Sequence, residues 1–279
     1  MVEPQENLRP SLLEWRPGAD IPRLEPGEVR TWIVELDAGV PPGADVDSVE
    51  PGAELAVLSD DERARAARFV RARERRRFAR CRAAVREILG RLLGEPADSL
   101  RFRAAAVGKP ELDRGPGVVD PIRFNVSHSA ELGIVAVCHG REVGVDLERL
   151  RPITEAERIV ASFFTAAEVD AFAMIPEADR AAAFLRGWTR KEAVLKGFGM
   201  GISGLSARHE TGFGTSGLTS RFTTAEPSSR VDRWMLWEAA PRPEFVAALA
   251  VDVGEPPLRG GEGAGSPAAG SLPATPAKP

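Results

Sequence analysis

The chain has 279 residues, a formal net charge of −4 at pH 7 and 43% hydrophobic residues. This length allows one large domain or two small ones, and the hydrophobic fraction is sufficient for a buried core. The acidic balance argues against a general nucleic-acid-binding protein, because such domains are usually strongly basic.

The sequence shows no sign of a membrane or secreted protein. No apolar run reaches the ~18 residues of a membrane span, and the N-terminus lacks the basic and apolar regions of a secretory signal. The two cysteines, Cys81 and Cys138, follow neither a metal-site nor a disulfide spacing. We therefore expect a reduced, cytoplasmic protein.

The first third of the chain predicts a loop, a strand and a long helical region. Repeated Pro and Gly make residues 1–28 an irregular segment, and residues 32–36 are typical of a strand. Ser59 and Glu62 form a capping box, which predicts a helix that continues to about Leu93 in one or two pieces. Eleven arginines lie between residues 63 and 86. We expect most of them to be solvated and together to attract an acidic or polyanionic partner.

The middle of the chain predicts a β-hairpin with acidic residues on one face. Its strands are residues 134–138 and 143–148, with a turn between them. Because side chains alternate along a strand, Gly144, Asp146 and Glu148 share the face opposite the core. Two carboxylates beside an open glycine suit a hard divalent cation, with room for a phosphate. An exposed polar strand face accounts for the same pattern.

A helix predicted over residues 181–196 carries a third acidic residue. Trp188, Glu192 and Lys196 lie at i, i+4 and i+8, so they share one side of the helix. A Glu and a Lys one turn apart usually form only a surface ion pair. Here Glu192 could instead join the two strand carboxylates at a metal, and Lys196 would then face the phosphates.

The remaining segments are assigned by local signals. Residues 154–164 predict a helix, and Thr165 with Glu168 forms a second capping box. The glycine-rich run at 197–204 follows a helix, so it predicts a helix end and not a phosphate-binding loop. Residues 234–237 and 245–253 predict closing strands. After Gly254 the chain has almost nothing to bury, which predicts a disordered tail.

Four motifs together resemble one enzyme family. They are F-N-V-S-H-S (124–129), G-V-D-L-E (144–148), F-F-T-A-A-E (163–168) and W-T-R-K-E-A-V-L-K (188–196). In this order and spacing, over roughly residues 55–205, the chain resembles the Sfp-type 4′-phosphopantetheinyl transferases. These enzymes move phosphopantetheine from coenzyme A to a serine of an apo carrier protein.

The resemblance implies an α/β (α+β) monomer of two similar, pseudo-symmetric lobes. Each lobe would be a small sheet packed on a long helix, with the active site in the cleft between them. We expect the irregular segment 1–28, an N-terminal lobe at 29–120, a C-terminal lobe with the metal site at 121–253, and a disordered tail at 254–279.

The resemblance also implies roles for individual residues. Asp146, Glu148 and Glu192 would hold Mg²⁺, and Lys196 would neutralise charge as adenosine 3′,5′-bisphosphate leaves. Either Glu192 or Glu168 would accept the serine proton, and the sequence leaves this choice open. The residues expected to contact coenzyme A are Arg65, Arg77, Lys109, Pro110, Ser127, His128, Asp146 and Lys196.

Two other functions remain compatible with these residues. One is another Mg²⁺-dependent phosphate-ester hydrolase that uses the same carboxylates, and the other is a non-catalytic module that binds through its basic helix. A Ser-His-Asp hydrolase is disfavoured because no G-x-S-x-G motif surrounds Ser127. The sequence does not choose among acyl, peptidyl and aryl carriers. We expect the carrier to dock on the arginine-rich helix and the glycine-rich loop.

Overall fold

The computed structural model describes residues 10–104, 109–118, 120–199, 210–213, 220–221 and 234–253. The tail at 254–279 and most of the glycine-rich loop at 197–204 lie outside these residues, so the predictions for them stay predictions. None of the described helices combines the length and the apolar composition that crossing a bilayer requires.

The first half of the chain builds a four-stranded sheet on a long helix. The strands in spatial order are β1 (Ser11–Glu14), β2 (Val29–Glu35), β6 (Leu132–His139) and β5 (Ile122–Ser129). β1 runs parallel to β2, and the other neighbours are antiparallel. Helices α1 (Asp60–Ala67) and α2 (Ala72–Leu93) follow the capping box at Ser59, as predicted. Buried leucine, isoleucine and valine side chains of α2 pack on β2, β5 and β6.

The second half repeats this plan. Its sheet has the order β7 (Val143–Arg149), β10 (Phe245–Asp252), β9 (Trp234–Ala239) and β8 (Ser220–Arg221). Helix α5 (Glu177–Phe198) packs on this sheet. Its Ala193 and Val194 lie in one apolar cluster with the aromatic ring of Trp234 on β9. Helices α3 (Ala156–Phe163) and α4 (Ala166–Ala173) pack beside the first half of α5.

Short elements complete the first half. They are the 3₁₀ turns η1 (Ala53–Val57) and η2 (Ala97–Ser99) and the two-stranded ribbon of β3 (Phe102–Ala104) and β4 (Pro110–Leu112).

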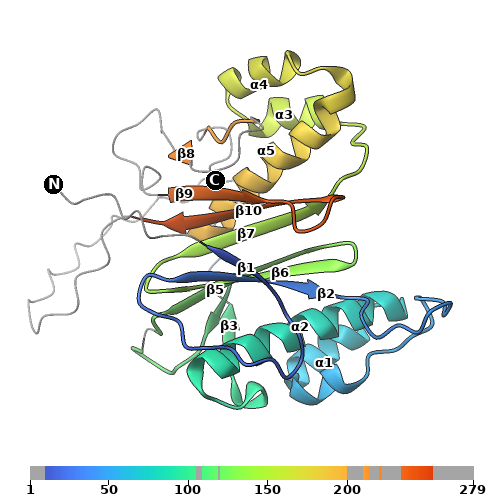
Figure 1. Cartoon of the computed structure of the whole chain (residues 1–279), viewed down its shortest axis with the longest axis vertical. Helices are drawn as coiled ribbons and strands as arrows, with labels where there is room; N and C mark the ends of the chain where they lie inside the picture. The colour runs from blue at the N-terminus through green and yellow to red at the C-terminus, as the bar shows by residue number, and fades with distance from the viewer. Residues whose placement is uncertain are drawn as a thin grey trace, which may run out of the picture.

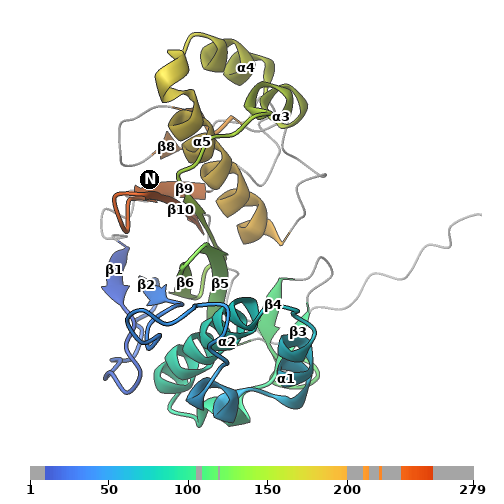
Figure 2. The ribbon, with the colours of Figure 1, turned by 90° about the vertical axis from the view of Figure 1, so that its right-hand side faces the viewer.

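The two sheets lie between the two long helices (Figures 1 and 2). The sheet faces that point away from α2 and α5 share one apolar cluster, to which β2, β6, β7, β9 and β10 all contribute. Val143, Val145 and Leu147 are at most 1% exposed in this cluster, which confirms the predicted core face of that strand. The expected mixed α/β fold, with two lobes that each pack a sheet on a helix, is confirmed.

The predicted hairpin of residues 134–148 is wrong. β6 pairs with β2 and β5, whereas β7 pairs with β10 in the other sheet. β7 instead runs beside β5, and side chains take the place of a backbone ladder. The backbone N–H groups of Val145, Leu147 and Arg149 donate to Asn125 Oδ1 (3.0 Å), Ser127 Oγ (3.3 Å) and Ser129 Oγ (3.1 Å). We call this contact the β5–β7 seam.

Two predicted segment boundaries also differ from the structure. A C-terminal lobe that starts at residue 121 would include β5 and β6, but these strands belong to the first sheet. The change of sheet falls in the turn between β6 and β7. In addition, Ser11–Glu14 forms β1 inside the segment predicted to be irregular, because it pairs with β2 and Thr31 Oγ1 donates to the Ser11 carbonyl (2.7 Å).

Gly144 does not leave open space, in contrast to the prediction. A Cβ at this position would lie 1.9 Å from the Ala193 carbonyl oxygen and 2.3 Å from the Gly197 nitrogen. The backbone of α5 therefore rests directly on β7 here. This close approach brings the helix face that carries Glu192 and Lys196 toward the acidic face of β7.

Most arginines of α2 are committed to ion pairs, which corrects the expectation of a solvated basic helix. Arg86 is 1% exposed and donates to the carbonyls of Ala97 and Leu100, both at 3.0 Å. The ion pairs join Arg75 to Glu50, Arg76 and Arg77 to Asp37, Arg80 to Glu54, and Arg82 and Arg86 to Glu62. These residues attach α2 to the preceding loops, so their charge is neutralised locally.

Gly144→Ala is expected to lower the free energy of unfolding by about 2 kcal/mol or more, because the new methyl group must displace helix backbone. Urea unfolding measures this loss. Gly133→Ala in β6 is the matched control, since its Cβ would meet its nearest neighbour at an ordinary 3.4 Å. Equal stability of the two variants would contradict the close approach of α5 and β7.

Candidate active site

Asp146 is the centre of a polar cluster between β7, β5 and α5. Its Oδ1 accepts hydrogen bonds from Ser127 Oγ (2.8 Å) and Lys196 Nζ (2.7 Å). Its Oδ2 is buried and has no hydrogen-bond partner among the described residues. Burial raises the pKa of this carboxyl group, and the Lys196 ammonium opposes that shift. One oxygen is therefore satisfied by protein groups and the other is not.

Two further carboxylates, those of Glu148 and Glu192, interact electrostatically with Asp146. Glu148 Oε2 accepts from Ser129 Oγ (3.0 Å) and Arg151 (2.7 Å). Glu192 is half-buried on α5, and its pKa is raised first by burial and then by the negative charges of Asp146 and Glu148. The predicted trio thus shares one electrostatic environment, as its sequence pattern indicates.

The chemistry of this trio fits a divalent cation. Within the described part of the chain, no three acidic, histidine or cysteine side chains are already arranged as a ready metal site. However, a cation bound between these groups would stabilise both the buried unpaired oxygen and the mutually repelling carboxylates. Carboxylate oxygens are the protein ligands that Mg²⁺ takes when phosphates complete its coordination.

Ser127, His128 and Lys196 surround the same point. Ser127 Oγ lies 3.0 Å from Lys196 Nζ. His128 is exposed at the surface, but the protein groups on its inner side lower its pKa by desolvation, and the Lys196 charge lowers it further. The charges of Glu74 and Arg77 on α2 also shift the pKa of His128, Glu74 upward and Arg77 downward. His128 therefore lies between the first turns of α2 and the last turns of α5.

Lys109 holds protein groups together at one edge of the site. Its ammonium donates to Glu142 Oε2 (2.8 Å) and to the carbonyls of Val143 (3.0 Å) and Gly197 (3.1 Å). The side chain is only 7% exposed. All three N–H groups are thus used to join the start of β7 to the end of α5.

The two arginines expected near a coenzyme A phosphate differ in their availability. Arg77 is paired with both oxygens of Asp37, at 2.9 and 2.5 Å. Arg65 is exposed, and its guanidinium group lies 5.2 Å from the centroid of the Phe78 ring. Arg65 has no ion pair with the residues that the structure describes, whereas Arg77 would have to leave Asp37 to bind a ligand.

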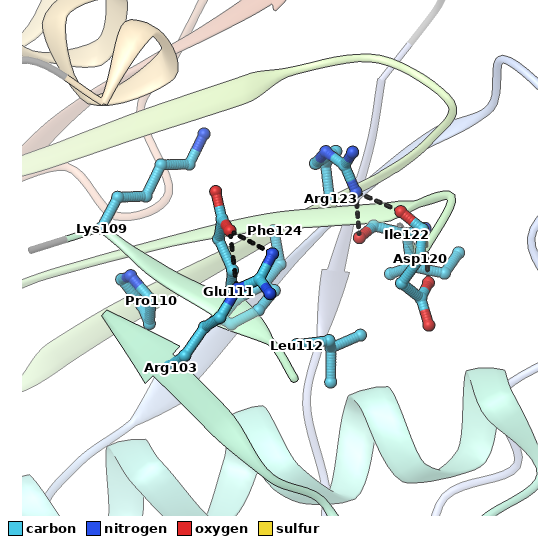
Figure 3. Close-up of a pocket in the computed structure, with 9 residues that line it drawn as sticks. All are labelled: Arg103, Lys109, Pro110, Glu111, Leu112, Asp120, Ile122, Arg123 and Phe124. Carbon is cyan, nitrogen blue, oxygen red and sulfur yellow. Dashed lines mark hydrogen bonds and ion pairs between the residues drawn. The ribbon is translucent and has the colours of Figure 1, made fainter. Parts of the chain in front are cut away.

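A small pocket opens beside Lys109 and Pro110 (Figure 3). Arg103 pairs with Glu111 across its mouth (3.3 Å), and Arg123 binds the carboxylate of Glu142 (2.7 Å). The lining residues are Arg103, Lys109, Pro110, Glu111, Leu112, Asp120, Ile122, Arg123 and Phe124. The lining therefore combines apolar side chains with three cationic and two acidic ones.

Glu168 is saturated by protein hydrogen bonds. It forms the predicted capping box with Thr165, and its Oε2 also accepts from Lys191 Nζ (2.8 Å). Its Oε1 accepts from the Thr211 nitrogen (2.6 Å), Thr211 Oγ1 (3.1 Å) and the Gly212 nitrogen (2.9 Å). The side chain is 1% exposed, and although burial opposes it, the Lys191 charge and these donors lower its pKa.

Several supporting residues are not identified by sequence reasoning. Asn125 and Ser129 share the strand face of Ser127, so their spacing of two residues is a signal that was available. Lys191 immediately precedes Glu192 in the sequence but points to Glu168. Thr211 carries no local signal, because its partner Glu168 is 43 residues away.

Two family models match this chain, one in each half. A model of the 4′-phosphopantetheinyl transferase superfamily matches residues 142–246, and one described as 4′-phosphopantetheinyl transferase, N-terminal, matches residues 50–140. The two matches meet in the turn between β6 and β7, where the chain changes sheets.

Individual relatives extend the match over most of the chain. The 4′-phosphopantetheinyl transferase HetI of Nostoc is 35% identical over 244 residues, which cover 85% of this chain and 93% of that protein. The enzyme psf-1 of Bacillus pumilus is 30% identical over 60% of this chain and 64% of its own length. The human L-aminoadipate-semialdehyde dehydrogenase-phosphopantetheinyl transferase is 26% identical over 52% of this chain and 49% of its own length. The chain therefore belongs to the 4′-phosphopantetheinyl transferase superfamily, enzymes that transfer 4′-phosphopantetheine from coenzyme A to carrier proteins.

Proposed function

We propose that this transferase is Mg²⁺-dependent and that Asp146, Glu148 and Glu192 hold the cation. The serine hydroxyl of an apo acyl, peptidyl or aryl carrier protein attacks the phosphate that bears the pantetheine. Adenosine 3′,5′-bisphosphate is then released. The observation that carries this proposal is the buried, unpaired Oδ2 of Asp146. A monomeric enzyme in the cytoplasm remains our expectation.

Lys196 and Ser127 position the reacting phosphates in this proposal. When bound, Mg²⁺ supplies positive charge that stabilises the phosphates during transfer. Lys196 is 29% exposed, so its ammonium can turn from Asp146 toward a bound diphosphate without first being uncovered. Ser127 Oγ holds Asp146 Oδ1 and leaves Oδ2 for the cation.

Glu192 is the better of the two proposed proton acceptors. Its raised pKa makes it a stronger base than an ordinary carboxylate, and it lies among the charges of the site. Glu168 has the opposite properties, because five donors and a lowered pKa make it a weak base. We therefore assign Glu168 to the support of α4 and of the Thr211 segment.

We propose that the nucleotide end of coenzyme A lies over Pro110 and the pocket of Figure 3, beside Ser127 and His128. The bare guanidinium of Arg65 favours it over Arg77 as a partner for the 3′-phosphate. Lys109 contributes to this binding by holding β7 against α5, since its ammonium already has three acceptors.

Asp146→Ala and Glu192→Ala are each expected to reduce modification of an apo carrier by roughly 10²-fold or more, because charge stabilisation in the transition state is lost. The measurement is the mass gain of the carrier in the presence of coenzyme A and Mg²⁺. Glu155→Ala, an exposed carboxylate paired with Arg158 on α3, should leave the rate unchanged. Full activity of Asp146→Ala would contradict the assigned site, and loss of the nucleotide without carrier modification would indicate a hydrolase.

Glu192→Gln should stabilise the metal-free protein at neutral pH. The pKa of Glu192 is raised in the folded state, so its ionised form opposes folding, and this cost disappears as pH falls through the folded pKa. Thermal unfolding without metal should show the advantage of the variant at neutral pH and its decline in acid. Added Mg²⁺ should stabilise the wild type and have little effect on Glu192→Gln. Equal stabilisation of both proteins by Mg²⁺ would exclude Glu192 as a ligand.

Glu168→Gln is expected to lose about 3 kcal/mol or more of stability, because the buried Lys191 ammonium loses the charge of the Glu168 carboxylate that lies 2.8 Å away. Urea unfolding measures this loss. In the folded protein, the pH dependence of kcat should keep its acidic limb, since Glu168 is not the proton acceptor. A stable Glu168→Gln protein that loses this limb would overturn our choice of Glu192.

A further inference from the structure

The corner between α1 and α2 presents a bare apolar side chain among unpaired arginines. Val70 is 94% exposed, and Arg68 and Arg71 on either side of it in the sequence are also exposed. In the described part of the chain, Arg68 and Arg71 have neither an ion pair nor a hydrogen bond from their side chains. The rest of the arginine-rich region differs, since the arginines from 73 to 86 pair with carboxylates.

The backbone of this corner is held in place by the rest of the protein. Arg75 donates to the carbonyls of Phe69 (2.6 Å) and Val70 (3.0 Å), and Glu50 binds the other side of the same guanidinium. Phe69 packs against Phe78 with ring centroids 5.4 Å apart. Phe69 therefore turns inward while Val70 points into solvent from an ordered turn. An exposed aliphatic side chain on such a turn is a contact residue ready for a partner.

The corner lies close to the active site. Arg71 is the N-cap of α2 and precedes Glu74 by three residues, a rise of about 4.5 Å along the helix axis. Glu74 and Arg77 act electrostatically on His128, whose ring also senses Lys196 and Asp146. A protein bound at the corner would thus lie on the side of His128 that faces the proposed position of the reacting phosphates.

The charge of the corner indicates an acidic partner. The whole chain carries a formal net charge of −4, whereas Arg68 and Arg71 make this corner locally positive. Positive charge on Arg68 and Arg71 would steer an acidic partner to this position and orient it there. We propose that the α1–α2 corner docks the carrier protein, which would present acidic side chains to the arginines and an apolar side chain to Val70.

This inference rests on the proposed function, and a matched pair of variants tests it. Arg68→Glu combined with Val70→Asp should raise KM for an acidic apo carrier roughly tenfold, with kcat and the dissociation constant for coenzyme A unchanged. The control is Arg158→Glu combined with Met174→Asp. It makes the same change in charge at an exposed arginine and an exposed apolar residue on α3 and α4. This control should keep the KM of the wild type.

The outcomes separate the two proposals. A wild type that modifies no carrier would refute the proposed function itself. If the wild type is active and the two double variants have equal KM values, the corner is not a docking surface. Weaker binding of coenzyme A in the corner variant, measured by calorimetry without carrier, would assign these arginines to the nucleotide and overturn the inference.

Discussion

The β5–β7 seam is the contact on which both the fold and the site depend. Two sheets meet there without a shared backbone ladder, because Asn125, Ser127 and Ser129 accept the N–H groups of β7. Buried N–H groups without such acceptors would each cost about 1–3 kcal/mol. Ser127 also donates to Asp146, and Ser129 donates to Glu148. The same hydroxyl groups therefore join the lobes and orient the acidic residues.

Close backbone packing brings the helix to this seam. Gly144 on β7 has no side chain, so the helix backbone at Ala193 and Gly197 can lie directly on the strand, and the absence of a side chain at Gly197 lets the Trp234 ring pack against the helix. Lys109 then joins the two elements through the carbonyls of Val143 and Gly197. The result is a rigid frame in which Lys196 contacts Asp146. Gly144 and Lys109 therefore contribute to the site by holding α5 on β7, which positions Lys196 beside Asp146.

The charges of the protein divide into two classes with different physical roles. The ion pairs of α2 and the Glu168–Lys191 pair are buried or half-buried and have nearly complete sets of partners. Such groups specify which segments lie together. The charges of Asp146 and Glu192 and those of the α1–α2 corner are not fully compensated by the protein. Uncompensated charge is where an enzyme of this kind can bind a cation, a phosphate or an acidic partner.

The sequence by itself predicted most of the helices and strands and indicated Asp146, Glu148 and Glu192 as candidate site residues. Capping boxes at Ser59 and Thr165, the alternation of residues 143–148 and the stripe on α5 are local patterns, and each describes a short stretch of backbone. Only the tertiary structure decided that β7 pairs with β10, that Glu168 is enclosed by its partners, and which arginines stay unpaired. Those outcomes depend on groups many residues apart, such as Glu62 and Arg86. No local periodicity records such pairs, because burial and the need to satisfy each charge are settled only when the whole chain packs.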